Sequence, residues 1–100
     1  MDKFLNFLGL CKRSGKLLEG YNKCEETLGK KPIYLFIFSK DISKRSEERF
    51  LKYCEKYKIP YINGFSKEEL GYSIGRSEIN ILAVLDENMA KRLILYQENN

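Results

Sequence analysis

The sequence predicts an α/β protein in which a mostly parallel sheet lies between layers of helices. Apolar residues recur at helical spacing in some segments and form short runs of β-branched and aromatic residues in others. One unbroken apolar run, residues 33–38, is typical of a central strand covered on both faces, with Tyr34, Phe36 and Phe38 in the interior. Strands and helices that alternate along a chain form a sheet sandwiched between helices.

The first third of the chain is expected to hold two helices joined by an extended segment. Apolar residues at helical spacing predict a helix at residues 3–13, with Asp2 as its N-cap. Residues 16–19 form the short extended segment. A second helix then begins at Gly20 and ends near Gly29, because a proline that follows shortly afterwards cannot continue it.

The rest of the chain is expected to alternate strands with helices. Ser66 and Glu69 have the spacing of a capping box, and Asp86 is suited to cap the last helix. In the longest helix, Phe50 and Tyr57 are expected to face inward. The expected elements are a strand at residues 33–38, a helix at 43–57, a strand at 59–62, a helix that Ser66 caps and that runs through Leu70, a strand at 79–85 and a final helix after Asp86. Gly71 and Gly75 are expected to flank the last turn of the helix after Ser66.

Length and composition correspond to one domain, residues 1–100, with enough apolar content (43%) for a packed core. The formal net charge of +4 permits a polyanionic partner but does not require one. The N-terminal segment lacks a signal-peptide pattern, and no apolar stretch approaches the length of a membrane span. We therefore expect a cytoplasmic protein with no membrane partner, and we expect it to be a monomer.

The reactive side chains make an enzyme a weak expectation. The chain contains no histidine, which removes the commonest general base and the commonest metal ligand. Cys11, Cys24 and Cys54 are expected to be buried reduced thiols, because none of them forms a C-x-x-C unit. Glu25 and Glu26 are neighbours on a helix and point to different sides. We expect no catalysis, no cofactor and no metal site.

Polar and basic residues gather in three segments that could contact an anion. The first is the start of the second helix, where unsatisfied N–H groups would face the ligand. There, Gly20 would let a ligand backbone approach closely, and Asn22 has the donors and acceptor needed to read a base edge. The segments are Lys16 to Lys23 with Lys30 and Lys31 at the far end of the same helix, Ser39 to Asp41, and Gly75 to Ile79.

Each segment also has an ordinary structural explanation. Gly20 suits a turn, Asn22 suits the first turn of a helix, and Lys23 suits a solvated surface. Asp41 suits a capping turn, and the segment after Gly75 is an unremarkable connection between a helix and a strand. On the residues alone, this structural explanation is favoured over ligand binding.

Three short segments resemble a known family. They read Ser-Gly-Lys-Leu-Leu-Glu-Gly at residues 14–20, Ser-Lys-Asp-Ile at 39–42 and Leu-Gly-Tyr-Ser-Ile-Gly at 70–75. With the order of the elements, they resemble the kink-turn RNA-binding ribosomal protein family, the superfamily of large-subunit proteins seven-Ae and thirty-e. The resemblance is to its small bacterial YlxQ-type members, and it covers nearly the whole chain.

The resemblance implies a three-layer α-β-α sandwich around a four-stranded mixed, mostly parallel sheet. It also implies non-catalytic binding of structured RNA, such as ribosomal RNA, that bends sharply beside tandem sheared G·A pairs. In the family, the second helix carries a Gly-x-Asn-Glu-x-x-Lys pattern. Gly20 and Asn22 match it, whereas Lys23 replaces the Glu and Glu26 replaces the Lys. Lys23 cannot accept a hydrogen bond from a guanine amino group but could reach a phosphate, which Glu26 would repel unless it pairs with Lys23 on the same face.

The resemblance assigns a role to the segment after Gly75 as well. In the family, this loop covers an extruded nucleotide with small apolar residues, and Ile79 is the best apolar candidate here. Cations would contact the RNA backbone, Asn22 would read a base edge and Gly20 would allow close approach. The candidate RNA-binding residues are Lys16, Gly20, Asn22, Lys23, Glu26, Lys30, Lys40, Gly75, Arg76, Ser77 and Ile79.

Two other functions stay open at the level of sequence. The first is a protein-interaction module on the same fold, with partners among ribosomal, transcription or translation proteins, if the exchange of Lys23 and Glu26 has altered the RNA face. The second is an enzyme that uses lysine or carboxylate chemistry, for which no substrate can be named.

Overall fold

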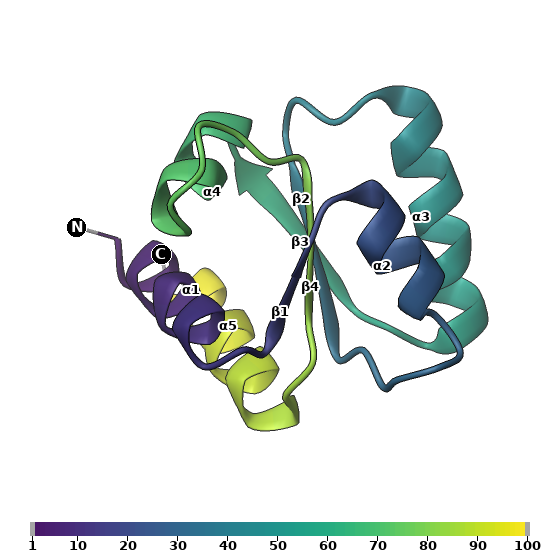
Figure 1. The fold of residues 1–100 in the computed structure, drawn as a ribbon, viewed down its shortest axis with the longest axis horizontal. Coiled ribbons are helices and arrows are strands. Elements are labelled where there is room, and N and C mark those ends of the chain that lie inside the picture. The colour runs from purple at the N-terminus through teal and green to yellow at the C-terminus, as the bar shows by residue number, and fades with distance from the viewer. Residues whose placement is uncertain (1, 100) are drawn as a thin grey trace.

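A computed structural model describes residues 2–99 and has the expected three layers. A four-stranded sheet lies between α1, α4 and α5 on one face and α2 and α3 on the other (Figure 1). The α/β sandwich is therefore confirmed. The elements in chain order are α1 (Lys3–Arg13), β1 (Leu17–Glu19), α2 (Tyr21–Thr27), β2 (Leu35–Ser39), α3 (Lys44–Tyr57), β3 (Tyr61–Phe65), α4 (Lys67–Ser73), β4 (Ile81–Val84) and α5 (Glu87–Glu98).

The sheet is mixed, but the expectation that it is mostly parallel is wrong. Its strand order is β1-β4-β2-β3. Only β2 and β3 pair in parallel, while β4 runs antiparallel to both of its neighbours. Val84 is the register partner of Leu17 on one side and of Leu35 on the other. The last strand therefore enters between the first two, which the burial pattern of a strand does not reveal.

The central strand β2 builds the core on both faces, as predicted. Leu35 and Ile37 belong to the cluster under α1, α4 and α5, whereas Phe36 and Phe38 belong to the cluster under α2 and α3. All four side chains are fully buried. Tyr34, expected in the interior, is only partly buried because it lies just before the strand begins.

Local capping signals account for the helix boundaries. Asp2, Ser43 and Asp86 cap their helices, and Ser66 and Glu69 form the predicted capping box with both hydrogen bonds present. Other expected boundaries shift. The second helix ends at Thr27, two residues before Gly29, and β3 begins only after Pro60. The helix after Ser66 runs through Leu70 as expected and ends at Ser73.

The three cysteines are in the state expected from the sequence. Cys11, Cys24 and Cys54 are buried free thiols. Burial raises the pKa of Cys11 and Cys54 to about 11 and that of Cys24 to about 12, so these thiols are unreactive at neutral pH. Among residues 2–99, no helix has both the length and the apolar character needed to cross a bilayer.

Candidate nucleic-acid interface

The start of α2 lies beside the start of β4. The backbone N–H of Gly20 donates to the carbonyl of Ile81 (2.9 Å). One residue earlier in the chain, Asn80 contacts the end of β2: its carbonyl accepts from the Ser39 N–H (2.9 Å), and its Oδ1 accepts from the Ser39 hydroxyl (2.6 Å). Segments that are about 60 and 40 residues apart in the chain therefore meet at one end of the sheet, where connections of α/β folds collect.

The loops after β2 and β3 join the same end. The N–H of Lys40 donates to the Phe65 carbonyl (2.8 Å), and the N–H of Lys67 donates to Oδ2 of Asp41 (2.9 Å). The Lys67 carbonyl in turn accepts from the N–H of Ile79 (3.0 Å). We call this surface the loop face and define it as residues 20–23, 39–41 and 75–80.

An ion-pair cluster centred on Glu19 fastens the loop after α4 to the edge strand. Glu19 ends β1, and its side chain is only 13% exposed. Nη1 of Arg76 lies 3.1 Å from Oε1 of Glu19, and Nζ of Lys12, from α1, pairs with Oε2. Burial alone would raise the pKa of Glu19, but the hydrogen bonds and charges of Lys12 and Arg76 outweigh it and hold the pKa below its usual range.

Two glycines shape that loop for different reasons. Gly71 lies inside α4 rather than beside its last turn, and a Cβ there would sit 2.5 Å from the Cα of Glu78. Gly75 ends the helical turn at φ 81°, a left-handed conformation that glycine adopts without strain, and the Arg76 N–H then donates to the Gly71 carbonyl (2.9 Å). The spacing of the two glycines therefore lets the loop fold back closely over α4.

Gly20 is required by backbone conformation. Its φ of 97° and ψ of 163° lie in a region that is essentially restricted to glycine. Among the described residues, no heavy atom outside its chain neighbours lies within 4 Å of the position a Cβ would take. The space above Gly20 is therefore open, as close approach of a ligand backbone requires.

The exposed side of α2 carries an ion pair. Nζ of Lys23 lies 3.7 Å from Oε1 of Glu26, and both side chains are about 60% exposed. Glu26 is therefore paired with Lys23 on the same face, which is the condition under which it would not repel a phosphate. Asn22 is exposed next to them, whereas Tyr21 and Glu25 face α3.

Charges at and beside the loop face are nearly balanced. Glu78 pairs with Lys67 (3.4 Å), as Glu26 does with Lys23 and Glu19 with Arg76, so acidic side chains do not dominate the surface. The cations are Lys12, Lys23, Lys40, Lys67 and Arg76, and the carboxylates are Glu19, Glu26, Asp41 and Glu78.

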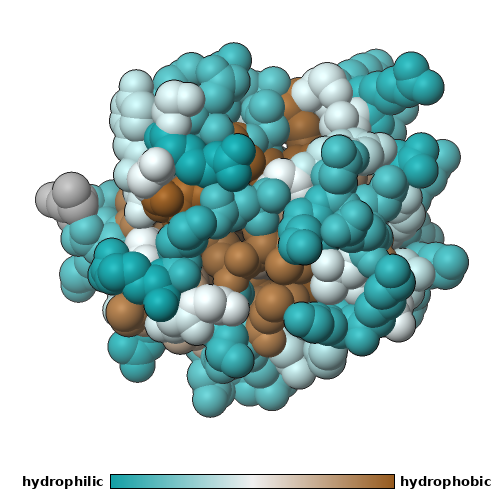
Figure 2. Space-filling view, in the orientation of Figure 1, coloured by the Kyte–Doolittle hydropathy of each residue, from teal (hydrophilic) through white to brown (hydrophobic). Residues whose placement is uncertain are grey.

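Two of the predicted contact lysines lie away from the loop face. Lys16 precedes β1, and its carbonyl accepts from the N–H of Leu85 (2.9 Å) at the opposite end of β4. The length of β1 separates Lys16 from Gly20 by about 13 Å. Lys30 follows the C-terminal end of α2, also at that opposite end. Figure 2, which views the β1 side, shows apolar side chains in the middle of the face, surrounded by hydrophilic ones.

The expectation that Ile79 offers an apolar surface to a base is wrong. Its side chain is only 7% exposed and packs in the core cluster with Leu70 and Ile74. Ile79 is apolar because it lies just before a buried strand and belongs to the core, not because it contacts a ligand. The exposed residues of the loop are Gly75, Arg76, Ser77 and Glu78.

Several residues that shape the surface were missed at the sequence level. Lys12, Glu19 and Asn80 act through partners remote in the chain, so no local signal marks them. Another cluster fastens α2 to α3: Glu25 Oε2 accepts from the Tyr53 hydroxyl (2.5 Å) and from Nε of Arg49 (2.7 Å). These bonds lower the pKa of Glu25.

Comparison with protein families is consistent with this architecture. Residues 2–94 match the model described as the ribosomal protein L7Ae/L30e/S12e/Gadd45 family. The chain belongs to this family. It is 30% identical over 87 residues to the RNA-binding protein YlxQ of Bacillus subtilis (strain 168), an alignment that covers 87% of each chain. It is 23% identical over 91 residues to the RNA-binding protein YlxQ of Enterococcus faecium, which covers 91% of this chain and 87% of the relative.

Solved structures show the same L7Ae-type fold. A Bacillus halodurans C protein of unknown function superimposes with a TM-score of 0.93 at 26% identity, over 98% of this chain and 99% of the other. The Giardia lamblia 15.5kD RNA binding protein superimposes with a TM-score of 0.77 over 95% of this chain and 84% of the other. At 19% identity, the second likeness concerns the fold alone.

Proposed function

We propose that the loop face binds structured, kink-turn-like RNA without catalysis, in or near the ribosome. The observation that carries the proposal is the contact between Arg76 and Glu19 (3.1 Å). It holds the loop after Gly75 against the strand that leads directly into Gly20. The two segments that the family uses for RNA thus form one surface, on which a bent RNA could contact both.

The exposed side chains of the loop face can contact both the phosphates and the base edges of an RNA. Lys23, Lys40 and Arg76 would contact phosphates, and the hydroxyl of Ser77 would add a neutral hydrogen bond. Asn22 would read a base edge beside Gly20. Lys16 and Lys30 have no place in this contact set, because they lie at the opposite end of the sheet.

The relatives support RNA as the partner. Two curated bacterial relatives are named RNA-binding proteins, and each alignment spans most of both chains. The family also includes ribosomal proteins by its description. A ribosomal RNA, or RNA bound near the ribosome, is therefore the target class that we favour.

A protein-interaction module is the second candidate. The nearly balanced charges of the loop face and the Lys23–Glu26 pair favour it, because a neutral surface attracts polyanions weakly. Its partners would be ribosomal, transcription or translation proteins.

Titration with a matched pair of RNAs tests the proposal. One RNA carries a kink-turn with tandem sheared G·A pairs, and the other has those pairs replaced by Watson–Crick pairs. We expect tighter binding of the first by about tenfold or more, since a mismatched pair costs about 1–3 kcal/mol. With three phosphates contacted, log affinity should fall against log salt with a slope of about −2 to −3. Equal weak binding of both RNAs would favour the protein-interaction module.

A further inference from the structure

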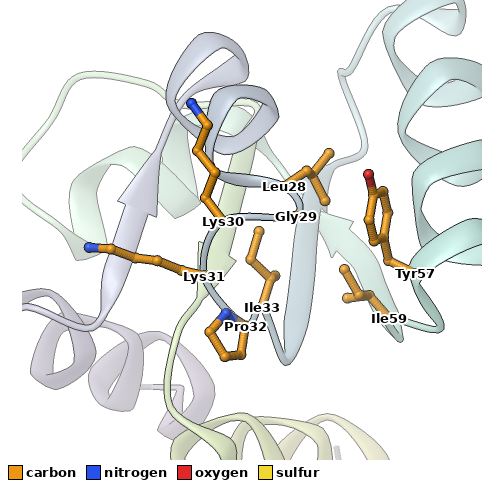
Figure 3. Close-up of a pocket in the computed structure, with 8 residues that line it drawn as sticks. All are labelled: Leu28, Gly29, Lys30, Lys31, Pro32, Ile33, Tyr57 and Ile59. Atoms are coloured by element: carbon orange, nitrogen blue, oxygen red, sulfur yellow. The ribbon is translucent and has the colours of Figure 1, made fainter.

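A pocket lies at the opposite end of the sheet from the loop face. It is an open pocket of about 450 Å³ between the C-terminal end of α2 and the C-terminal end of α3. Figure 3 shows apolar side chains from both elements turned toward one another, while the ammonium groups of Lys30 and Lys31 point outward. The lining residues are Leu28, Gly29, Lys30, Lys31, Pro32, Ile33, Tyr57 and Ile59.

Tyr57 gives the pocket an aromatic wall. It was expected to face inward, but it is 38% exposed because α3 ends there and Lys58 takes a left-handed conformation (φ 57°). Its hydroxyl lies 3.7 Å from the position that a Cβ on Gly29 would take, an ordinary van der Waals distance, so the ring lies directly beside the turn after α2. Nζ of Lys56 lies 5.3 Å from the centre of the Tyr57 ring. The ring therefore combines an exposed π surface with a cation beside it.

The charge around the pocket has one sign. Lys30 and Lys31 line it, Lys56 lies at the tyrosine, and none of the lining residues, all within the described chain, is acidic. Glu26, in the last turn of α2, is engaged by Lys23. Cations around an aromatic and apolar recess are the combination with which proteins hold single-stranded nucleic acid.

We propose that this pocket binds an unpaired nucleotide of a single-stranded RNA segment. A base would enter between Tyr57 and the apolar floor formed by Leu28 and Ile33, and Lys30 and Lys31 would contact the flanking phosphates. An acidic peptide would use the lysines but would leave the aromatic wall without a role. This proposal rests on the proposed function in one respect, which is that RNA is the partner. It uses none of the loop-face residues.

One RNA could reach both surfaces. The molecule measures 34 × 27 × 24 Å along its principal axes, and the pocket and the loop face lie at opposite ends of the sheet. A single-stranded tail of about ten nucleotides is within the range of site sizes for such surfaces. A folded RNA held at the loop face could therefore extend its tail along the side of the protein into the pocket.

Fluorescence anisotropy with three probes tests the proposal. The probes are the kink-turn RNA alone, the same RNA with a tail of about ten uridines, and the uridine oligonucleotide by itself. We expect the tail to tighten binding by about tenfold, through a second tethered contact. The salt slope should steepen by about 1.4, since each phosphate on a single strand contributes about 0.7.

Variants assign the gain to the pocket. Tyr57→Ala and the pair Lys30→Ala/Lys31→Ala should each reduce the tail's gain to twofold or less, with urea unfolding curves confirming that both remain folded. Tyr57→Phe keeps the ring and should keep the gain. Two matched controls elsewhere on the surface, Tyr72→Ala on α4 and Lys91→Ala on α5, should also keep it.

Three outcomes would overturn the proposal. They are a tail that brings no gain, a gain that survives Tyr57→Ala, and displacement of the tail by poly-glutamate as readily as by oligouridine. The last two would mean that the lysines attract any polyanion. If the kink-turn RNA does not bind at all, the proposed function fails, but the uridine oligonucleotide alone still tests the pocket.

Discussion

Arg76 and Glu19 are 57 residues apart in the chain, yet their side chains form a 3.1 Å hydrogen-bonded ion pair. Lys12 holds the other oxygen of the same carboxylate. One partly buried acid thus positions cations from two other segments at the border of the loop face. The arrangement also reduces the charge that Arg76 can offer to a phosphate, so Glu19 both positions and moderates that cation.

Glu19→Gln should separate these two effects. Glutamine keeps the shape but loses the charge that Lys12 and Arg76 share, so we expect the free energy of unfolding to fall by about 1 kcal/mol. Arg76 would then be available to any phosphate. Binding of RNA without G·A pairs should therefore strengthen, and its salt slope should steepen by about 0.9 for one added phosphate.

Urea unfolding and salt-dependent RNA titration measure both effects. For the stability measurement, Glu26→Gln is the matched control, because this exposed carboxylate contributes little to stability. If Glu19→Gln leaves both stability and the binding of the control RNA unchanged, Glu19 does not position the loop in solution.

The same pair should give stability a specific dependence on pH. The pKa of Glu19 in the folded protein lies below its ordinary value of 4.5. Its contribution is therefore fully present above about pH 4.5 and is lost as the pH falls through the lower, folded pKa. We expect the stability difference between the natural protein and Glu19→Gln to be constant from about pH 5 to 7 and to shrink on further acidification. A difference that grows toward low pH would contradict the assignment.

Features that depend on a few neighbouring residues could be predicted from the sequence. Asp2 and the pair Ser66 and Glu69 cap helices as expected, because a cap is satisfied within one turn. Phe36 and Phe38 are buried as expected, because a central strand has no solvent-facing side. Such local signals determine where an element begins and whether it is buried.

Features that depend on which elements become neighbours could not be predicted. Nothing local in residues 81–84 shows that β4 pairs antiparallel on both sides. For the same reason, Lys16 seemed close to the loop face by sequence, although β1 carries it to the other end of the sheet. Ile79 was expected to be exposed but is buried, and Tyr57 was expected to face inward but is exposed. Apolar spacing cannot locate the last residue of an element that the core covers.

Alanine at the two loop glycines should have different consequences. At Gly71, the new Cβ would lie 2.5 Å from the backbone of Glu78, so Gly71→Ala should cost about 1–3 kcal/mol and displace the loop. At Gly75, among the described residues, nothing lies within 4 Å of a new Cβ beyond its chain neighbours, and only the left-handed φ opposes alanine. Gly75→Ala should cost about 1–2 kcal/mol.

Urea unfolding measures the change in the free energy of unfolding. Amide chemical shifts of residues 76–80 measure whether the loop after Gly75 is displaced. We expect large shifts throughout that segment for Gly71→Ala, and shifts limited to its start for Gly75→Ala. Gly75→Asn should be the mildest of the three, because asparagine tolerates the left-handed region. Equal shifts in the two alanine variants would refute the steric role of Gly71.

Gly20 allows conformation and close approach to be tested separately. L-alanine at φ 97° and ψ 163° should cost about 1–3 kcal/mol, whereas D-alanine adopts a positive φ without that penalty. The protein with D-alanine, assembled by ligation at Cys24, should therefore fold like the natural chain. If RNA approaches the backbone there, the added methyl group should still weaken binding. Unchanged RNA affinity of the D-alanine protein would mean that RNA does not approach the side of the Gly20 backbone on which the methyl group lies.

Asn22→Ala tests direct reading of a base. The side chain is exposed at the start of α2, so its loss should not affect stability. If it bonds a base edge, the affinity for kink-turn RNA should fall by about 1–3 kcal/mol, with little change for the RNA without G·A pairs. An equal loss on both RNAs would assign Asn22 to the backbone instead.

Exchanging Lys23 and Glu26 is the sharpest test of specificity. The double variant Lys23→Glu/Glu26→Lys restores the Gly-x-Asn-Glu-x-x-Lys pattern. It also conserves the net charge and the ion pair between the two positions, which joins Nζ of Lys23 to Oε1 of Glu26 at 3.7 Å in the natural protein. Any change in RNA binding must therefore come from which group stands at which position. A carboxylate at position 23 can accept from a guanine amino group, which the ammonium cannot.

We expect the double variant to improve discrimination between the two RNAs by about 1–3 kcal/mol, the range of one good base contact. Each single variant breaks the ion pair and changes the net charge by two, so it should shift the binding of both RNAs together, weaker for Lys23→Glu and stronger for Glu26→Lys. Discrimination that is unchanged in the double variant would mean that this side of α2 does not meet the G·A pairs. The RNA would then have to be read by Asn22 and the loop after Gly75 alone.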